Sequence, residues 1–349
     1  MNIIEYIKKN QNKKFEEKEF NEVDNIILSI ISYLEFDGLT YKNNSLKTCG
    51  EKFLNKYTYK EVASLGLPQK DAYNCLKEIV NTKRYENIKI LDYIYLGTKE
   101  EQFSAITFQI KKDLIFVAFE GTDNLMSGWK EDFQLAYMYP IPSQIHAIKY
   151  LNKTIKYFGP KIIVGGHSKG GNLALISSME VNKLKQNKII KIYNNDGPGL
   201  RKKEFNSNKY LRIKDKYIHV VPYNSFIGMM LRNDNYKVVE SSRKTILSHY
   251  PISWIVEENS FKETELKIKS KELEKNIIEW LDNHDDSQRK IMIDNVFKIF
   301  ETCEIEDTRK LKMISYITKV IKEVKNIDNQ TKKLAIDFIK HSFFNKNKI

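Results

Sequence analysis

Residues 161–174 read "KIIVGGHSKGGNLA". Three apolar residues lead into paired glycines, a histidine and a serine, and after two more glycines an apolar stretch resumes with helical spacing. A strand that passes through a glycine-flanked turn into a helix is the context of a nucleophile elbow, where G-x-S-x-G exposes a serine. In this chain Ser168 is that serine, and Gly166 and Gly170 flank it.

The bareness of this turn has a physical reason. Small residues on either side leave room for a sharp turn in which Ser168 can adopt strained dihedral angles. Its hydroxyl then projects above the carboxyl edge of the sheet, where the amino terminus of the next helix favours negative charge. A phosphate-binding loop or a dinucleotide fingerprint would need a different order of glycine and lysine. We therefore expect Ser168 to be a nucleophile.

The segments around the elbow predict an α/β protein. Helical patterns at 143–158 and 169–186 lie between runs of β-branched and aromatic residues. Alternating strands and helices are typical of a mainly parallel sheet with helices on both faces. The strands are expected at 88–98, 103–110, 113–121, 161–166, 188–196, 216–222 and 236–241.

Helical sequence precedes and follows this core. The apolar residues of 21–36 fall on one helical stripe, and four helical segments follow residue 262. We expect a helical N-terminal region at 1–87, an α/β core with the nucleophile elbow at 88–260 and a C-terminal helical region at 261–349.

The composition is that of an ordinary globular protein, with 349 residues, 41% hydrophobic and 30% charged. The first ten residues carry an acid and two lysines where a secretory signal needs an apolar run, and no segment reaches the length of a membrane span. Cys49, Cys75 and Cys303 lack metal-site or C-x-x-C spacing, which favours a reducing compartment. We expect a cytoplasmic protein.

The formal net charge is +13, and basic residues are densest in 201–216, "RKKEFNSNKYLRIKDK". No RNP-like strand, zinc-finger spacing or basic-region heptad accompanies the charge, so a nucleic-acid partner is not expected. One interpretation is a solvated lysine-rich surface. The other is attraction to an anionic membrane surface, because this stretch leaves the sheet at the same edge as Ser168.

A serine nucleophile needs a base, and His249 is the candidate. It follows the last predicted strand in a loop closed by Pro251, which fits the chain order serine, acid, histidine. His167 is expected to pack beside the elbow and His219 to lie in the core. The remaining histidines fall in helical segments and are interpreted as surface or packing residues: His146, His284 and His341.

The acid is expected at Asp196, in "YNNDGPG", at the end of the strand that follows the elbow helix. Its carboxylate would share the edge with Ser168 and orient the imidazole. The alternative interpretation is that Asp196 organises the Gly-Pro-Gly turn after it. Asp215 and Asp234 are weaker candidates for the acid.

An oxyanion on the substrate requires preorganised donors. One is the backbone N–H of Lys169, the residue after the nucleophile. The second is expected from "FEGTDNLMSGWKEDF" (119–133), where Gly121 allows close approach and Thr122 offers an N–H and a hydroxyl.

Several motifs in order carry a resemblance that covers nearly the whole chain: "AFEGTD", "GWKEDF", "VGGHSKGGNLA", "NNDGPGL", "VVPYNSFIGMML" and "SHYPISWIV". The sequence resembles the Mbeg-like bacterial family of α/β hydrolases, distant relatives of class 3 lipases. This resemblance implies an α/β-hydrolase fold and serine hydrolase activity. Glu120 departs from the arginine usual in lipases, and Asn224 or Ser225 occupies the usual acid position, which is why we assign the acid to Asp196.

The sequence therefore favours a lipase-like or esterase-like serine hydrolase that cleaves acyl esters, with lipids among the candidate substrates, through an acyl-enzyme on Ser168. No metal or cofactor is implied. Residues 226–232, "FIGMMLR", are open to two interpretations, an acyl pocket or plain core. The alternative function is a scaffold with little or no activity that binds a protein partner through the C-terminal helices. Acyl chain, headgroup and oligomeric state are left open.

Overall fold

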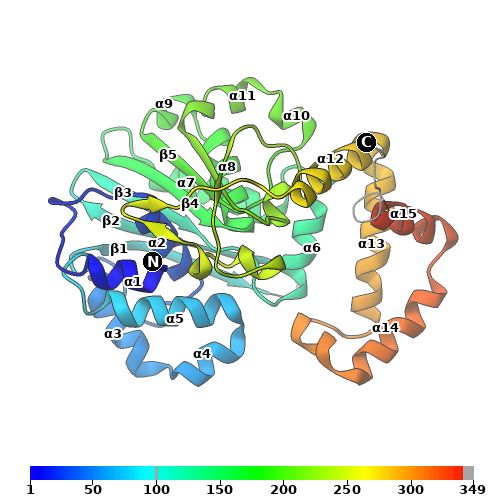
Figure 1. Ribbon diagram of the computed structural model, residues 1–349, viewed down its shortest axis with the longest axis horizontal. Coiled ribbons are helices and arrows are strands. Elements are labelled where there is room, and N and C mark those ends of the chain that lie inside the picture. The colour runs from blue at the N-terminus through cyan, green and yellow to red at the C-terminus, as the bar shows by residue number, and fades with distance from the viewer. Residues whose placement is uncertain (99–100, 341–349) are drawn as a thin grey trace.

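A seven-stranded sheet forms the centre of the computed structural model, which describes residues 1–98 and 101–340 (Figure 1). The strands lie side by side in chain order. The first two pairs are antiparallel and all later pairs are parallel, so the predicted mainly parallel α/β fold is confirmed. The strands are β1 (Lys89–Gly97), β2 (Gln102–Lys111), β3 (Leu114–Phe119), β4 (Lys161–His167), β5 (Ile189–Asn195), β6 (Tyr217–Pro222) and β7 (Tyr236–Val239).

Both faces of the sheet are buried, as the alternation along β3 shows. Ile115, Val117 and Phe119 pack with α7 (Pro142–Thr154) and α8 (Lys169–Glu180). Phe116 and Ala118 point the other way, into the cluster formed with the N-terminal helices. Apolar residues at every position of a central strand are what a sheet covered on both faces requires.

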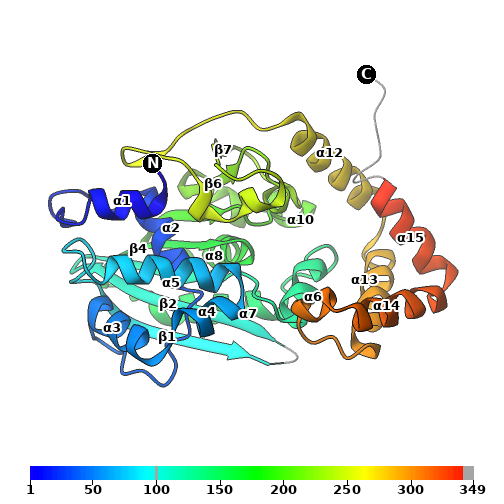
Figure 2. The ribbon, with the colours of Figure 1, turned by 60° about the horizontal axis from the view of Figure 1, so that its bottom comes forward.

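The N-terminal helices cover one face of the sheet (Figure 2). Helix α2 lies directly against β3 and β4 and buries nearly every side chain, including Asp24, which forms an ion pair with Arg84 at 2.5 Å. The five helices are α1 (Ile3–Lys9), α2 (Glu22–Ile31), α3 (Leu46–Lys56), α4 (Tyr59–Leu65) and α5 (Leu67–Ile79).

The opposite face is covered by α7 and α8, with three short helices nearby: α9 (Lys183–Gln186), α10 (Lys202–Phe205) and α11 (Asn208–Leu211). The expected helix at 169–186 is divided, because Val181 takes an extended conformation and Asn182 caps α9. Helix α6 (Met126–Gln134) lies where the sequence suggested only a loop.

The C-terminal helices lie beside α6 at one end of the sheet (Figure 2). They follow a small hairpin of β8 (Val256–Glu257) and β9 (Ser260–Phe261) and form a third apolar cluster with α6 and the loop after β6. In the part of the chain described here, no helix combines the length and the apolar character needed to cross a bilayer. The helices are α12 (Ile268–Asn283), α13 (Asp286–Thr302), α14 (Ile314–Asn326) and α15 (Asn329–Ile339).

Candidate active site

Ser168 is the single residue between the end of β4 and the start of α8, and its backbone has φ of 58° and ψ of −132°. A positive φ is uncommon for a residue with a side chain and strains the backbone. The flanking glycines make this turn sterically possible. A Cβ at Gly166 would lie 2.3 Å from the backbone of Gly170, and one at Gly170 would lie 2.1 Å from the carbonyl oxygen of Phe119. The geometry is that of a sharp elbow that presents a serine at the carboxyl edge of the sheet.

His249 ends a 3₁₀ turn at Thr245–His249 and reaches the residue after β5. Its Nδ1 lies 2.7 Å from Oδ2 of Asp196, so the Nδ1–H donates to the carboxylate. This bond fixes the ring tautomer and leaves Nε2 as the nitrogen that can accept a proton.

Asp196 is fully buried and has a positive φ of 52°. Its second oxygen, Oδ1, accepts hydrogen bonds from the Ser225 hydroxyl at 2.5 Å and from the Gly228 N–H at 3.1 Å. Burial raises the pKa of Asp196, and the hydrogen bonds from His249, Ser225 and Gly228 act against that rise. The carboxylate is thus held in one position by donors on both oxygens.

The other two candidate acids lie elsewhere. Asp234 accepts a hydrogen bond from Tyr210 at 2.8 Å and pairs with Lys214 at 2.9 Å. Asp215 is exposed in a 3₁₀ turn before β6. The structure brings Asp196, and neither of these, to His249.

His167 connects His249 to the N-terminal region. It is buried, its Nε2 lies 2.8 Å from the His249 carbonyl oxygen, and its Nδ1 lies 3.0 Å from the Tyr33 hydroxyl. Burial, and secondly the nearby His249, hold the pKa of His167 well below its usual value. The neutral ring therefore donates to the carbonyl of His249 and accepts from Tyr33. A packing role was predicted for His167, whereas nothing in the sequence pattern indicated Tyr33.

The other histidines lie apart from this group. His219 is buried in β6 with its ring stacked near Tyr217, and burial lowers its pKa to about 3. His146 pairs with Glu101, and His284 stacks on Trp280. His341 lies outside the described residues.

The segment after β3 passes directly behind Ser168. A Cβ at Gly121 would lie 2.1 Å from the Tyr33 hydroxyl and 3.1 Å from Cβ of Ser168, so only glycine fits here. The next residue, Thr122, donates its hydroxyl to Asp132 in α6 at 2.5 Å. Burial raises the pKa of Asp132 to about 6, against the opposing effects of Lys169 and of the Thr122 hydrogen bond. Asp132 was missed because α6 itself was not predicted.

Lys169 holds α6 against the start of α8. Its ammonium group donates to Oε1 of Gln102 at 2.6 Å and pairs with Glu131 of α6 at 3.2 Å, and all three residues are buried. The side chain is thereby committed to structure. Its backbone N–H is the group that was predicted to donate to an oxyanion at the elbow.

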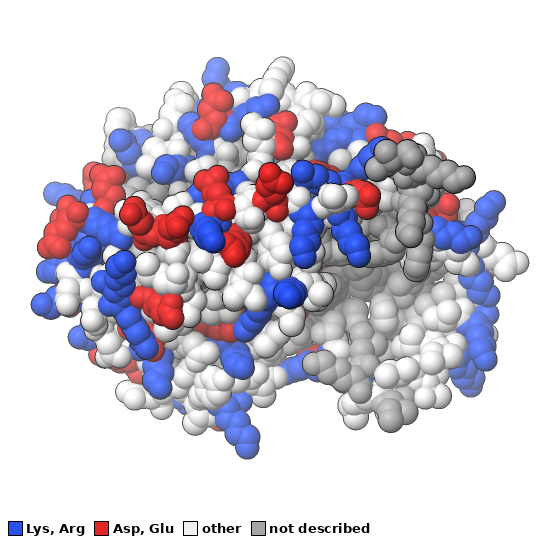
Figure 3. All heavy atoms as spheres, viewed as in Figure 1, with Lys and Arg blue, Asp and Glu red and all other residues white. Residues whose placement is uncertain are grey.

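A cavity of about 430 Å³ opens over Ser168 and His249. Most of its walls are apolar, and many of them come from residues 226–231 and from α12, α13 and α15. Figure 3 shows this face hollowed between the α/β core and the C-terminal helices, where the visible walls are uncharged. Phe226, Ile227, Met230 and Leu231 line the cavity, whereas Met229 is fully buried in the apolar cluster. The stretch 226–232 therefore contributes to both a cavity wall and the core.

The comparisons with known proteins identify a family for this chain. The sequence model of the Mbeg1-like family matches residues 79–298, more than half of the chain. The chain belongs to the Mbeg1-like family. The resemblance noted in the sequence is thus confirmed. No curated protein matches this family member significantly.

Two solved structures of lipases are similar to this Mbeg1-like chain. The structure titled M37 lipase is 17% identical with a TM-score of 0.37, covering 58% of this chain and 68% of its own. A fungal lipase–inhibitor complex, titled as a model for interfacial activation, is 15% identical with a TM-score of 0.36, covering 62% and 76%. Similarity at this level does not transfer activity or substrate to the Mbeg1-like chain.

Proposed function

We propose that this chain is a serine hydrolase that cleaves carboxylic esters through an acyl-enzyme on Ser168. One observation carries the proposal: a serine in a strained turn shares an apolar cavity with His249, whose Nδ1–H is hydrogen bonded to the buried carboxylate of Asp196. Nucleophile, base and orienting acid on three different elements form the arrangement required for acyl transfer.

In the acylation step, Oγ of Ser168 forms a bond to the ester carbonyl carbon while Nε2 of His249 accepts the hydroxyl proton. Asp196 holds the ring in position and stabilises its charged form. The bond to the alcohol oxygen then breaks, and the imidazolium returns its proton to the leaving alcohol.

The oxyanion is assigned to two backbone N–H groups, those of Lys169 and Thr122. Since the Thr122 hydroxyl already donates to Asp132, the N–H is the donor that remains for a substrate. Asp132 then serves to position Thr122. In the second step, water activated by His249 attacks the acyl carbon, and the carboxylate product leaves Ser168.

The cavity supports an ester with an apolar acyl chain. Its volume of about 430 Å³ and its aliphatic and aromatic walls suit a hydrocarbon rather than a charged acid. A lipid ester is one substrate of this kind. We also propose a cytoplasmic location. It is supported by three cysteines that are all free and buried.

A fluorophosphonate probe tests the proposal, because it reacts quickly only with an activated serine. We expect mass spectrometry to locate the label on Ser168 of the wild-type protein. Ser168→Ala should abolish labelling, His249→Ala should slow it strongly, and Ser64→Ala, at an exposed serine, should label like the wild type. Labelling of Ser168→Ala at the wild-type rate would contradict the proposal.

A second candidate function is a partner-binding scaffold without turnover. It is favoured by α14, where Ile317, Ile321 and Val324 are exposed at helical spacing. A scaffold of this kind predicts neither labelling of Ser168 nor ester turnover, so the same experiment distinguishes the two functions.

A further inference from the structure

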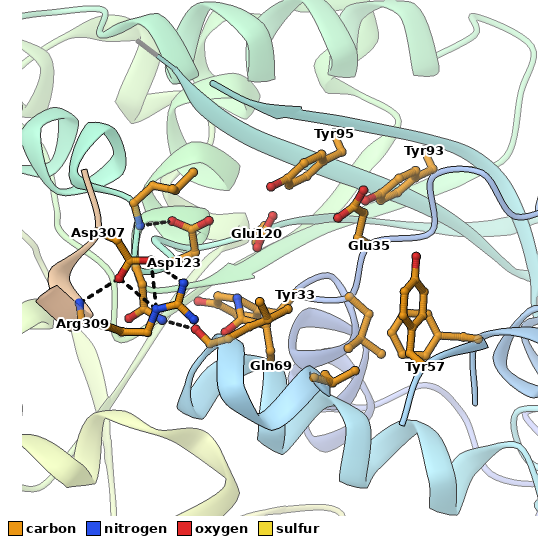
Figure 4. A pocket seen from close by; sticks show the side chains of 16 residues that line it. Tyr33, Glu35, Tyr57, Gln69, Tyr93, Tyr95, Glu120, Asp123, Asp307 and Arg309 are labelled. Carbon is orange, nitrogen blue, oxygen red and sulfur yellow. Dashed lines mark hydrogen bonds and ion pairs between the residues drawn. The ribbon is translucent and has the colours of Figure 1, made fainter. Parts of the chain in front are cut away.

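A second cavity, of about 230 Å³, lies on the other side of Tyr33 from Ser168. Tyr33 lines both cavities, and Figure 4 shows the second one from close by. We call it the tyrosine–carboxylate pocket. Its walls come from distant parts of the chain: Tyr93 and Tyr95 of β1, Glu35 and Gln69 near the N-terminal helices, Glu120 and Asp123 after β3, and Asp307 with Arg309.

Carboxylates dominate the charge of this pocket. Glu120 is 4% exposed at its centre, Asp123 is half-buried beside it, and Glu35 lies exposed near the two tyrosines of β1 (Figure 4). Glu120 and Asp123 repel each other, and after burial this repulsion is the main cause that raises the pKa of Glu120 well above its usual value, while Lys169 and a hydrogen bond from Ser104 act against the rise. A positive charge bound between them would offset the electrostatic cost of burying the two carboxylates and would reduce their mutual repulsion.

The basic side chains near this pocket already form hydrogen bonds or ion pairs with other groups of the protein. Among the described residues that line it, the one basic side chain is Arg309, which donates to Asp307 at 2.9 Å and to the Ser64 carbonyl oxygen at 2.6 Å. The ammonium group of Lys169 donates a hydrogen bond to Gln102 and forms an ion pair with Glu131. Glu120 and Asp123 therefore face the pocket without an ion-pair partner among the described residues.

A buried polar atom in the wall also lacks a partner. Within the described residues, Oε1 of Gln69 accepts no hydrogen bond, although this residue is only 7% exposed. Buried polar atoms without a partner are rare in native proteins and indicate a missing ligand or water. Oε1 of Gln69 can only accept, so a group that fills the pocket must donate.

Aromatic rings complete the wall. Tyr93 and Tyr95 lie two residues apart and so project from the same face of β1. Tyr95 lies along its strand over Gly97, where a Cβ would come within 2.3 Å of the tyrosine hydroxyl. Phe53 and Tyr57 add further rings from the end of α3. Aromatic faces beside carboxylates attract cations through the ring quadrupole.

We propose that the tyrosine–carboxylate pocket binds a small organic cation with N–H donors, a primary ammonium or a guanidinium group. The carboxylates of Glu120 and Asp123 supply the charge, the rings supply an apolar surface for the carbon atoms, and Gln69 and Tyr93 take up the N–H groups. This site does not depend on the chemistry of Ser168.

The test is a titration of the full chain with n-butylammonium at low salt, followed by ligand-observed NMR. We expect saturable binding that weakens at least tenfold in Glu120→Gln and severalfold in Tyr93→Phe. n-Butyltrimethylammonium, which lacks N–H donors, and uncharged n-butanol should bind at least tenfold more weakly than n-butylammonium. Glu301→Gln, an exposed surface carboxylate that pairs with Lys130, is the matched control and should bind like the wild type.

Asp123→Asn replaces Glu120→Gln if that variant fails to fold, as judged by thermal unfolding. Fluorophosphonate labelling of Ser168 in the same variants separates the two proposals, because loss of labelling alone leaves the cation site intact. Three results would overturn the inference. The first is no saturable binding of n-butylammonium to the wild type, and the second is binding to Glu120→Gln and Asp123→Asn that is as tight as to the wild type. The third is preferential binding of Ca²⁺ over n-butylammonium.

Discussion

Two residues with unusual backbone conformations hold the proposed chemistry. Ser168 and Asp196 have φ values of 58° and 52°, and each immediately follows a parallel strand. Strain of this kind persists only where the surrounding structure enforces it. Asp196 is enforced by β6, whose Val220 carbonyl accepts its N–H at 2.7 Å, and by the donors to its carboxylate. The carboxylate of Asp196 is thereby fixed before a substrate arrives.

Asp196→Asn should lower kcat by about 10³–10⁴-fold, because an amide cannot hold the same tautomer of His249. The fold should survive, since asparagine has the same shape and can still accept from Ser225. Ester hydrolysis under saturating substrate measures the effect. Asp234→Asn, at the acid paired with Lys214, should stay within a few-fold of the wild type. The reverse order of the two variants would place the acid at Asp234.

Asp71 in α5 makes stability depend on pH. It is 7% exposed, its Oδ2 has no hydrogen-bond partner among the described residues, and burial raises its pKa from 3.8 to about 6. The folded state therefore holds this proton more tightly than the unfolded chain, and its contribution to the unfolding free energy falls between about pH 4 and pH 6. Above that window the ionised carboxylate is destabilising.

Asp71→Asn should consequently stabilise the protein by at most roughly 3 kcal/mol at pH 8 and have little effect at pH 4. Urea unfolding at a series of pH values measures the difference. Asp113→Asn, in the exposed turn between β2 and β3, is the control and should show no such dependence. A gain that is the same at both pH values would attribute the effect to something other than ionisation.

Helix α6 was not predicted from the sequence. Its segment "MSGWKEDFQ" contains a glycine, and Leu125 at its N-cap provides no side-chain hydrogen bond. Local signals for a helix are therefore weak. Tertiary contacts supply the stability instead, through Glu131 with Lys169 and Phe133 against Phe297 of α13. Such contacts join residues far apart in sequence and leave no local pattern.

Helix α15 bears on substrate choice because Ala335 lines the cavity over Ser168. Ala335→Trp should fill part of the apolar volume and lower kcat/KM for long-chain p-nitrophenyl esters by about tenfold or more. Activity on the acetate ester and labelling of Ser168 should change little, since the catalytic groups are untouched. Lys333→Trp, on the exposed side of the same helix, is the control. A uniform loss for all chain lengths would contradict an acyl-chain role for this cavity.

On the face that Figure 3 shows, basic residues are interspersed with acids. Within 201–216, four of the basic side chains form ion pairs with nearby carboxylates: Arg201 with Asp286, Lys202 with Asp282, Lys209 with Glu180 and Lys214 with Asp234. These pairs reduce the field that the stretch can project, and salt screens it within about 8–10 Å.

Attraction to an anionic membrane surface remains a prediction, with a severalfold rather than larger effect. Ester hydrolysis on anionic vesicles should exceed that on zwitterionic vesicles at low salt, and the difference should shrink as salt is added. Reversing Arg201, Lys202 and Lys203 to glutamate should remove it, whereas reversing Lys8 and Lys9 in α1 should not. Equal rates on both surfaces at all salt concentrations would identify 201–216 as a solvated face.

Sequence patterns were most informative where one local segment carries the whole signal. The strands, the parallel sheet and the turn at Ser168 were predictable because periodicity and glycine spacing are local. The hydrogen bond between Asp196 and His249 follows from topology, since both residues belong to loops at the same edge. The Tyr33–His167 contact and the tyrosine–carboxylate pocket join segments separated by a hundred residues or more, and no spacing rule indicates them.

The outer wall of the cavity lies partly beyond the segment that the family model matches. The family match ends at residue 298, within α13, whereas Ala335 and Phe338 of α15 also line the cavity. Under the proposed function, the catalytic residues and part of the acyl-binding wall therefore lie in different parts of the chain. A relative with a different C-terminal helix at this wall should then, under the same proposal, prefer a different acyl chain with the same catalytic residues.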